Sequence, residues 1–227
     1  MEFHLKPAET SPQEIPAKKP LIIGYYNIPN FVTALSLLFT ASACYFVFMK
    51  KVALGILCLI YTGIIDGIDG AIARKMHANA DENTKKFGAE LDSLTDAINY
   101  TVGPICIGFA MGFNSPVDLL IYWFYLVAAS QRVTHFNIFS VPKRDGIIYY
   151  IGIPTPYATI ILGWAYAFFI LFSLPKIFIQ LAYALTAFLF VLNIEIRDIR
   201  TIRWIVPFIQ PIAITAIWIY IYYTKGI

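Results

Sequence analysis

The chain has 227 residues, of which 59% are hydrophobic and only 14% are charged, and its mean hydropathy is +0.67. Soluble domains carry about a quarter charged residues, so this composition excludes an ordinary soluble domain and indicates a membrane protein. The formal net charge of +3 is too small to indicate a nucleic-acid partner. Each membrane-spanning helix needs roughly 20 residues, so the length suits one bundle of spans without a second globular domain.

The N-terminal region differs from the rest of the chain. Residues 1–26 contain four prolines among charged and polar residues, without the early apolar run of a signal peptide. We therefore expect residues 1–26 to be a cytosolic tail and residues 27–227 to be one membrane domain. Cys44, Cys58 and Cys106 lie within apolar stretches without metal-binding spacing, and are expected to be core thiols.

The chain contains seven apolar segments long enough to span a membrane. Pro154 and Pro156 are expected to interrupt the fifth of them near its start. The sequence thus predicts an all-α, polytopic integral-membrane helix bundle of about seven spans. The segments are Ile28–Met49, Val52–Ala73, Phe87–Gly112, Val117–Ile138, Ile151–Phe172, Lys176–Asn193 and Trp204–Tyr223.

Lysine and arginine are unequally divided between the two sets of connections. With the N-terminus inside, the outer connections hold only Lys50, Lys51, Lys176 and Lys225, and the other basic residues lie at the inner ends. Basic residues concentrate on the cytoplasmic side of membrane proteins. The N-terminus and the acidic motifs described next are therefore expected to be cytoplasmic.

Two acidic residues lie at the end of the second apolar segment, where an ionised carboxylate is costly unless something compensates it. At about 100° per residue, Asp66, Asp69, Gly70 and Ala73 share one helix face. Gly70 costs about 1 kcal/mol relative to alanine within a helix, which indicates a use for its missing side chain. A cleared backbone would let a flat, phosphate-bearing ligand approach closely.

The third apolar segment repeats this arrangement, since Gly88, Asp92 and Asp96 follow one another a turn apart. If the two segments are neighbours, the four carboxylates can converge as one set of metal ligands. Neither motif contains histidine, which argues against zinc, and a ligand set of oxygen atoms suits Mg²⁺ or Mn²⁺. Several carboxylates permit two ions, the arrangement that supports displacement at phosphorus.

Two other interpretations of the acidic residues stay open. They could be solvated helix ends that pair with Arg74, Lys85 and Lys86. They could also line the ion path of a metal transporter. A permeation path needs acids deep in the spans or in the outer half, whereas the only acid expected outside is Asp118.

The order Asp-x-x-Asp-Gly-x-x-Ala-Arg, followed by Gly-x-x-x-Asp-x-x-x-Asp, resembles the signature of the CDP-alcohol phosphotransferases, integral-membrane enzymes of phospholipid synthesis. The resemblance implies a six-helix family core plus one further span, and a homodimer. Lys75 to Phe87 is longer than the family's usual spacer, and this polar stretch is expected to be an extended cytosolic loop. The signature residues here are Asp66, Asp69, Gly70, Ala73, Arg74, Gly88, Asp92 and Asp96.

The resemblance also implies a role for each residue. The donor would be CDP-diacylglycerol in the lipid membrane, and Asp96 would be the general base. Two Mg²⁺ or Mn²⁺ ions would be bound by Asp66, Asp69, Asp92 and Asp96. The nucleotide would be bound by Asn30, Thr33, Asp66, Gly70, Ala73, Arg74 and Gly88. Helix capping is the alternative role of Asn30 and Thr33.

Three segments resemble the family members that use L-serine as the acceptor: Gly88–Asp96, Gln131–Asn137 and Gly152–Pro156. His135 stands where those members have a second arginine. An acceptor with a carboxylate needs a cation, and Arg132 could bind it or the lipid phosphate bidentately. Its alternative role is that of a positive-inside charge. We expect transfer of a phosphatidyl group to L-serine, with inositol phosphate, glycerol phosphate or choline as alternative acceptors.

Overall fold

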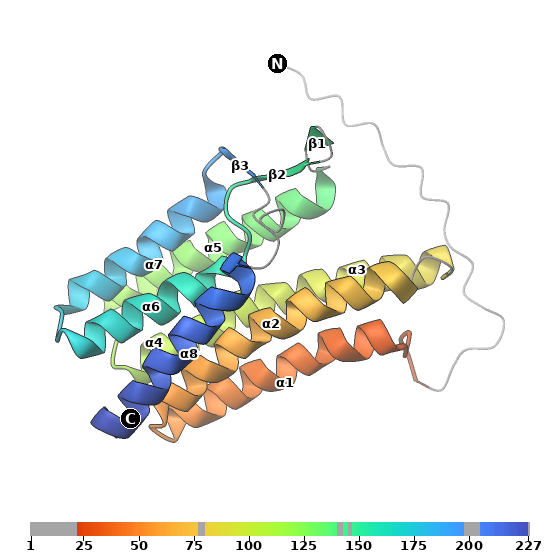
Figure 1. Cartoon of the computed structure of the whole chain (residues 1–227). Helices are drawn as coiled ribbons and strands as arrows, with labels where there is room; N and C mark the ends of the chain where they lie inside the picture. Colours follow the sequence, from red (N-terminus) through yellow and green to blue (C-terminus); the bar gives the residue numbers. More distant parts are fainter. Residues whose placement is uncertain (1–21, 77–79, 140–142, 145–146, 198–204, 227) are drawn as a thin grey trace, which may run out of the picture.

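The computed structural model describes residues 22–76, 80–139, 143–144, 147–197 and 205–226. Within these residues the helices stand side by side as seven columns (Figure 1). The third column is one continuous stretch in which a π-helical turn, η2, joins α3 to α4. The columns are α1 (Ile28–Phe48), α2 (Val52–Met76), α3 (Glu82–Ala97) with η2 (Ile98–Val102) and α4 (Gly103–Ala110), α5 (Pro116–Ile138), α6 (Tyr157–Leu171), α7 (Lys176–Val191) and α8 (Ile205–Lys225).

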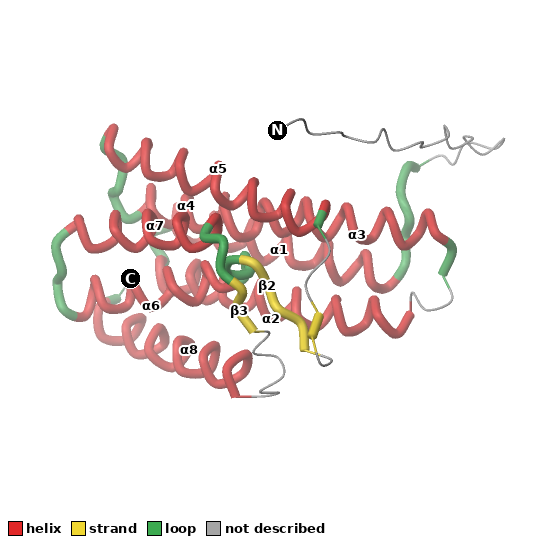
Figure 2. The backbone as a smooth tube through the Cα atoms, turned by 90° about the horizontal axis from the view of Figure 1, so that it is seen from above, coloured by secondary structure: helices red, strands yellow, loops and turns green. Residues whose placement is uncertain are grey.

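A small antiparallel sheet at one end of the bundle adds to the expected all-α fold. Its strands are β1 (Lys143–Arg144), β2 (Ile147–Ile151) and β3 (Glu195–Arg197), in the order β1-β2-β3. Figure 2 shows this sheet beside the helix ends. The two outer strands are linked across β2, because the Arg144 guanidinium donates two hydrogen bonds of 2.9 Å to the Glu195 carboxylate.

The helices α1 and α2 form a tight antiparallel hairpin because small residues line their interface. A Cβ atom at Gly55 would lie 2.3 Å from Val47 Cγ1 and 3.0 Å from the Ala43 carbonyl oxygen. Small residues allow such close backbone approach between helices of membrane proteins. At a rise of about 1.5 Å per residue, the same register places Asn30 at the level of Gly70.

The π-helical turn has an identifiable cause in Pro104, which lacks the N–H that a helix would direct at the carbonyl of Tyr100. The Tyr100 carbonyl instead accepts a hydrogen bond from the Tyr125 hydroxyl. The buried Asn99 side chain ties the same turn to α1, since its Nδ2 donates to Ser36 Oγ (2.8 Å) and its Oδ1 accepts from Thr40 Oγ1 (2.6 Å). The backbone immediately after Asp96 is therefore fixed from two sides.

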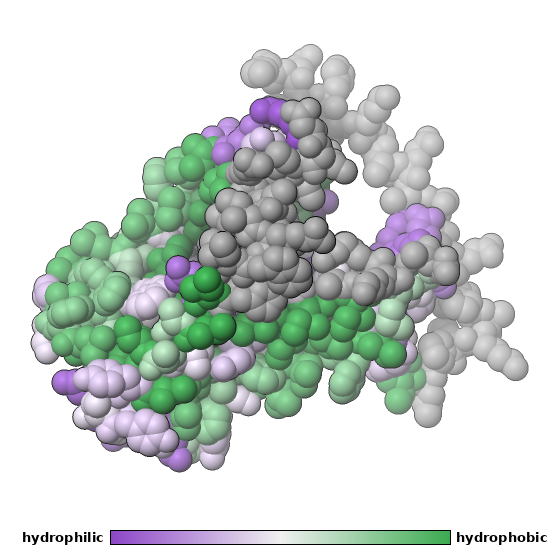
Figure 3. Space-filling model, viewed as in Figure 1, coloured by the Kyte–Doolittle hydropathy of each residue, from purple (hydrophilic) through white to green (hydrophobic). Residues whose placement is uncertain are grey.

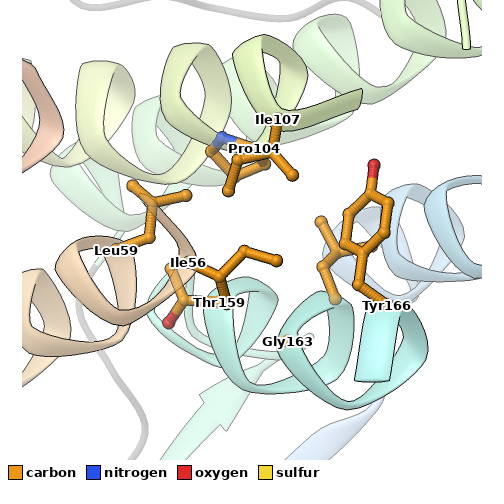
Figure 4. A pocket seen from close by; sticks show the side chains of 8 residues that line it. Ile56, Leu59, Pro104, Ile107, Thr159, Gly163 and Tyr166 are labelled. Carbon is orange, nitrogen blue, oxygen red and sulfur yellow. The ribbon is translucent and has the colours of Figure 1, made fainter. Parts of the chain in front are cut away.

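The interior is packed with aromatic and aliphatic side chains. Tyr122, Tyr125 and Tyr183 are buried, and the Tyr183 ring contacts each of the other two edge to face. A small cavity lies between α2, α4 and α6 (Figure 4). Its lining is mainly apolar, with the Thr159 and Tyr166 side chains at its edges, so it is a packing defect of the core and no candidate ligand site.

Much of the outer surface is apolar, as the space-filling view shows for one face (Figure 3). Among the described residues, α1 meets both the length and the hydropathy expected of a membrane span, while Val52–Ile68, α6 and α7 are apolar but shorter. Contiguous exposed apolar surface on this scale is typical of contact with lipid. Exposed large side chains include Leu38, Tyr45, Leu120, Trp123, Phe124, Leu181, Leu185 and Phe188.

The prediction of an extended loop from Lys75 to Phe87 is wrong, because α2 continues to Met76 and α3 begins at Glu82. Asp81 caps α3, since its carboxylate accepts a hydrogen bond of 2.6 Å from the Thr84 N–H. The hydrogen bonds from Thr84 also lower the pKa of Asp81 below its usual value. The polar composition of this segment led to the prediction of a loop, although the segment contains both a helix cap and helix-forming residues.

The predicted start of the fifth span, Ile151, is also wrong. Ile151 ends strand β2, and α6 begins only at Tyr157, after Pro154 and Pro156. Proline and the residue before it both disfavour helix, so the chain stays irregular until the second proline has passed. The irregular residues 152–156, the β2–α6 connection, lie at the end of the bundle that carries the sheet (Figure 2).

Gly152 fixes this connection against the end of α7. Its φ is +69°, and an added Cβ would lie 2.7 Å from the Phe190 carbonyl oxygen. Gly112 has the same left-handed conformation, with φ +84°, but a Cβ atom added there would have no other atom within 4 Å. The two glycines therefore separate the cost of a left-handed conformation from the cost of crowding.

We predict that Gly152→Ala lowers the free energy of unfolding by roughly 2–4 kcal/mol, since both costs apply. Gly112→Ala carries only the first and should lose about 1 kcal/mol. Thermal melting of both purified variants in the same detergent measures the difference. Equal melting temperatures would show that the contact with α7 contributes nothing.

Candidate metal centre

Three carboxylates converge between α2 and α3. One carboxylate oxygen from each of Asp66, Asp92 and Asp96 lies within 4.8 Å of the others. Asp66 comes from the second half of α2, and the other two stand one turn apart near the end of α3, so the antiparallel course of two helices that both pack on α1 brings them together. Asp92 is exposed, while Asp66 and Asp96 are half-buried. The expected convergence of these three acids is confirmed.

Asp96 occupies the innermost position of this cluster. Its Oδ2 accepts a hydrogen bond of 3.3 Å from the Thr155 hydroxyl, while its buried Oδ1 has no hydrogen-bond partner among the described residues. Asp66 and Asp92 both act electrostatically on this carboxylate. A buried carboxylate oxygen without a donor is costly, and a cation beside it would remove the cost.

The donor set fits a hard divalent cation. Three carboxylates from two rigid helices offer oxygen ligands, which Mg²⁺ and Mn²⁺ prefer, and further positions can be filled by water or by phosphate oxygens. A cation bound by Asp66 and Asp92 would lower the cost of the unpartnered Oδ1 of Asp96 by its nearby charge, without needing that oxygen as a ligand. Of the bases that could have neutralised the acids, Lys86 forms an ion pair of 2.8 Å with Glu82.

Arg132 lies on α5 next to the same cluster. It is buried, its Nε donates a hydrogen bond of 3.0 Å to the Ile153 carbonyl oxygen, and its guanidinium stands 5.6 Å from the centre of the Phe136 ring. The Asp96 carboxylate is close enough to act on it electrostatically. Residues that follow the positive-inside rule need only lie at the cytoplasmic surface, whereas Arg132 is buried and held by a backbone hydrogen bond.

Several predicted site residues are only partly placed. Gly70 and Gly88 lie on α2 and α3 as expected, in helical backbone. The side chains of Asp69, Ala73 and Arg74 lie outside the described residues, although their backbone belongs to α2.

Asn30 and Thr33 are both buried on α1, but neither caps the helix. The cap is Asn27, whose side chain accepts from the Asn30 N–H. Asn30 Nδ2 instead donates to the Tyr25 carbonyl oxygen (2.7 Å), and Thr33 Oγ1 donates to the Pro29 carbonyl oxygen (3.2 Å). Their alternative role as helix caps is therefore wrong, and their role at the nucleotide stays a prediction.

Sequence reasoning missed two residues that shape the site, Thr155 and Asn99. Thr155 contacts Asp96 from a segment 59 positions away in the chain, and Asn99 fixes the turn that follows Asp96. The two prolines that flank Thr155 were the available signal, since they predict an irregular segment that could reach the helix ends. Nothing in the local sequence marks Asn99 beyond its being a polar residue within an apolar segment.

Comparison with known proteins shows the family of the chain. The family model for CDP-alcohol phosphatidyltransferases matches residues 26–193. A Helicobacter pylori protein named CDP-diacylglycerol–serine O-phosphatidyltransferase is 27% identical over 186 residues, which cover 79% of this chain and 75% of that protein. Proteins of the same name from Saccharomyces cerevisiae and Methanocaldococcus jannaschii are 33% and 32% identical over 107 and 105 residues. Those two matches cover 44% and 46% of this chain, and 37% and 46% of the relatives.

Proposed function

Since the chain belongs to the CDP-alcohol phosphatidyltransferase family, we propose that it transfers the phosphatidyl group of CDP-diacylglycerol to L-serine, giving phosphatidylserine and CMP. The chain is a phosphatidyltransferase, and the proposal concerns its substrates. The convergence of Asp66, Asp92 and Asp96 is the observation that carries it, because this reaction needs oxygen ligands for metal ions beside a phosphate. The printed names of the relatives support serine as the acceptor.

We assign the binding of two Mg²⁺ or Mn²⁺ ions to Asp66, Asp69, Asp92 and Asp96. When bound, such ions would neutralise the phosphate oxygens and stabilise charge that develops at phosphorus. Gly70, Ala73 and Gly88 would leave room for the cytidine nucleotide along the same helix faces. Asn30, at the level of Gly70 across the α1–α2 hairpin, together with Thr33 and Arg74, would complete the nucleotide site.

Asp96 is our candidate for the general base. The serine hydroxyl would give its proton to the unpartnered Oδ1 while its oxygen forms a bond to phosphorus. The bond from phosphorus to the CMP oxygen would break as the new bond forms, and CMP would leave with the electron pair. This assignment uses the one buried oxygen of the cluster for which the described residues provide no donor.

Arg132 is our candidate for the acceptor carboxylate or the lipid phosphate. Its Nε is occupied by the Ile153 carbonyl, and no described residue bonds to its two terminal nitrogens, which could make a bidentate contact with an oxyanion. Because Asp96 is near enough to act on it electrostatically, an anion at Arg132 would lie close to the base. The side-chain hydroxyl of the same serine could then reach phosphorus.

We further propose a multi-pass topology with the cluster on the cytoplasmic side. The sheet, the start of α1 and the start of α3 lie at one end of the bundle, and the end of α8 lies at the other (Figure 1). Lys85, Lys86 and Arg144 lie at the first end, which the positive-inside rule assigns to the cytoplasm. The homodimer implied by the family resemblance stays a prediction.

We predict that the purified protein releases CMP from CDP-diacylglycerol only when L-serine and either Mg²⁺ or Mn²⁺ are both present. The lipid product, analysed by mass spectrometry, should be phosphatidylserine. Undiminished turnover in excess EDTA would contradict the metal assignment. Faster turnover with inositol phosphate, glycerol phosphate or choline at saturating concentration would contradict serine and leave the reaction class intact.

We predict that Asp96→Asn reduces turnover by roughly 10²–10⁴-fold, because the variant keeps the shape of the side chain and removes the base. Binding of CDP-diacylglycerol, measured by titration, should change far less than the rate. Asp81→Asn makes the same chemical change at the other end of α3, where asparagine caps equally well, and should leave turnover unchanged.

Two results would contradict this role of Asp96. Wild-type turnover in Asp96→Asn would exclude it as the base. Loss of both nucleotide and metal binding in that variant would make Asp96 principally a metal ligand.

A further inference from the structure

The β2–α6 connection, residues 152–156, reaches from the sheet to the acidic cluster and is itself held by backbone contacts to the end of α7. The Gly152 N–H donates to the Ile194 carbonyl oxygen (2.9 Å), and the Ile153 N–H donates to the Leu189 carbonyl oxygen (3.2 Å). The close approach of Gly152 to the Phe190 carbonyl adds to this attachment. The connection therefore has a fixed position.

Two residues of this connection, separated by Pro154, contact the site. The Ile153 carbonyl oxygen accepts the hydrogen bond from Arg132 Nε (3.0 Å), and the Thr155 hydroxyl donates to Asp96 Oδ2 (3.3 Å). The side chain that would bind an anion and the carboxylate that would take the proton are thus held by the same short segment. Thr155 is buried, so its hydroxyl has little access to water.

The Thr155 hydroxyl does not cap the helix that follows it, because the Tyr157 and Ala158 N–H groups donate to the Pro154 and Thr155 carbonyl oxygens. Threonine just before a helix commonly caps it by accepting a backbone N–H, which stabilises a protein by about 1 kcal/mol. The α6 helix begins two residues later, and no side chain caps it. The hydroxyl proton is directed at the Asp96 carboxylate instead.

We propose that Thr155 is a positioning residue for Asp96: its hydrogen bond to Oδ2 holds the carboxylate with Oδ1 free for the reacting proton. The inference rests on the proposed function, in which Asp96 is the base. A carboxylate without this bond would be free to rotate, and Oδ1 would lose its orientation. Thr155 itself touches neither substrate nor metal in this account.

The test compares Thr155→Val, Thr155→Ser and Thr159→Val. Valine keeps the shape of threonine and removes the hydroxyl, while serine keeps the hydroxyl. Thr159 is the matched control, because it is also buried, lies one turn further along, and donates to the Pro156 carbonyl oxygen (2.8 Å) instead of a carboxylate. Thermal melting in detergent confirms that each variant is folded.

We expect kcat to fall about ten-fold in Thr155→Val, with KM for CDP-diacylglycerol unchanged, since one hydrogen bond to a charged group is lost. Thr155→Ser should restore most of kcat, and Thr159→Val should match the wild type. A second readout needs no turnover: the electron paramagnetic resonance spectrum of bound Mn²⁺ should change in Thr155→Val and stay unchanged in Thr159→Val.

The proposal is overturned if Thr155→Val matches Thr159→Val in both kcat and the Mn²⁺ spectrum. It is also overturned if serine fails to restore the rate, or if KM rises while kcat stays constant. A failure of the proposed function looks different, because the wild type would then release no CMP with any acceptor. The Mn²⁺ spectra of the two valine variants would still decide the role of Thr155.

Discussion

Mutual repulsion of carboxylates is the constraint on which the rest of this structure depends. Three acids whose oxygens approach within 4.8 Å, one of them with a buried oxygen that no described residue satisfies, destabilise a fold unless a cation is bound among them. The cost is higher beside apolar helices, where water is scarce. A functional role explains why so unfavourable an arrangement of carboxylates is kept. The binding of a divalent metal ion beside a phosphate is the role that fits the all-oxygen ligand set.

The surrounding helices hold the acids in place from several directions. On α1 and α2, Gly55 permits a close hairpin, while Pro104 and Asn99 set the turn that follows Asp96. From the far side, the β2–α6 connection contributes the Thr155 hydroxyl and a carbonyl for Arg132. The small sheet contributes indirectly, because the Arg144–Glu195 ion pair links its outer strands next to this connection. Rigid support of this kind is what precise placement of reacting groups requires.

Local patterns in the sequence were sufficient for the helices and the acids. The i,i+4 spacing of Asp92 and Asp96 placed them on one face of α3, and the apolar segments located five of the seven columns to within three residues at both ends. The predictions for the polar segment before Phe87 and for the start of α6 were wrong. In the first, polar composition did not reveal a helix cap, and in the second, two prolines delayed the start of the helix. The contact between Thr155 and Asp96 depends on tertiary structure, so local sequence periodicity could not predict it.

The central claim is that Asp66 and Asp92 hold the metal that activates the phosphate, and direct location of the ion is its sharpest test. Crystals grown with Mn²⁺ and a CDP-containing ligand would show the ion by anomalous scattering. We expect a peak between α2 and α3, about 2.1 Å from carboxylate oxygens of both residues, with a phosphate oxygen of the nucleotide as a further ligand. A nucleotide bound elsewhere, or a cluster neutralised by basic side chains with no ion between the helices, would contradict the claim.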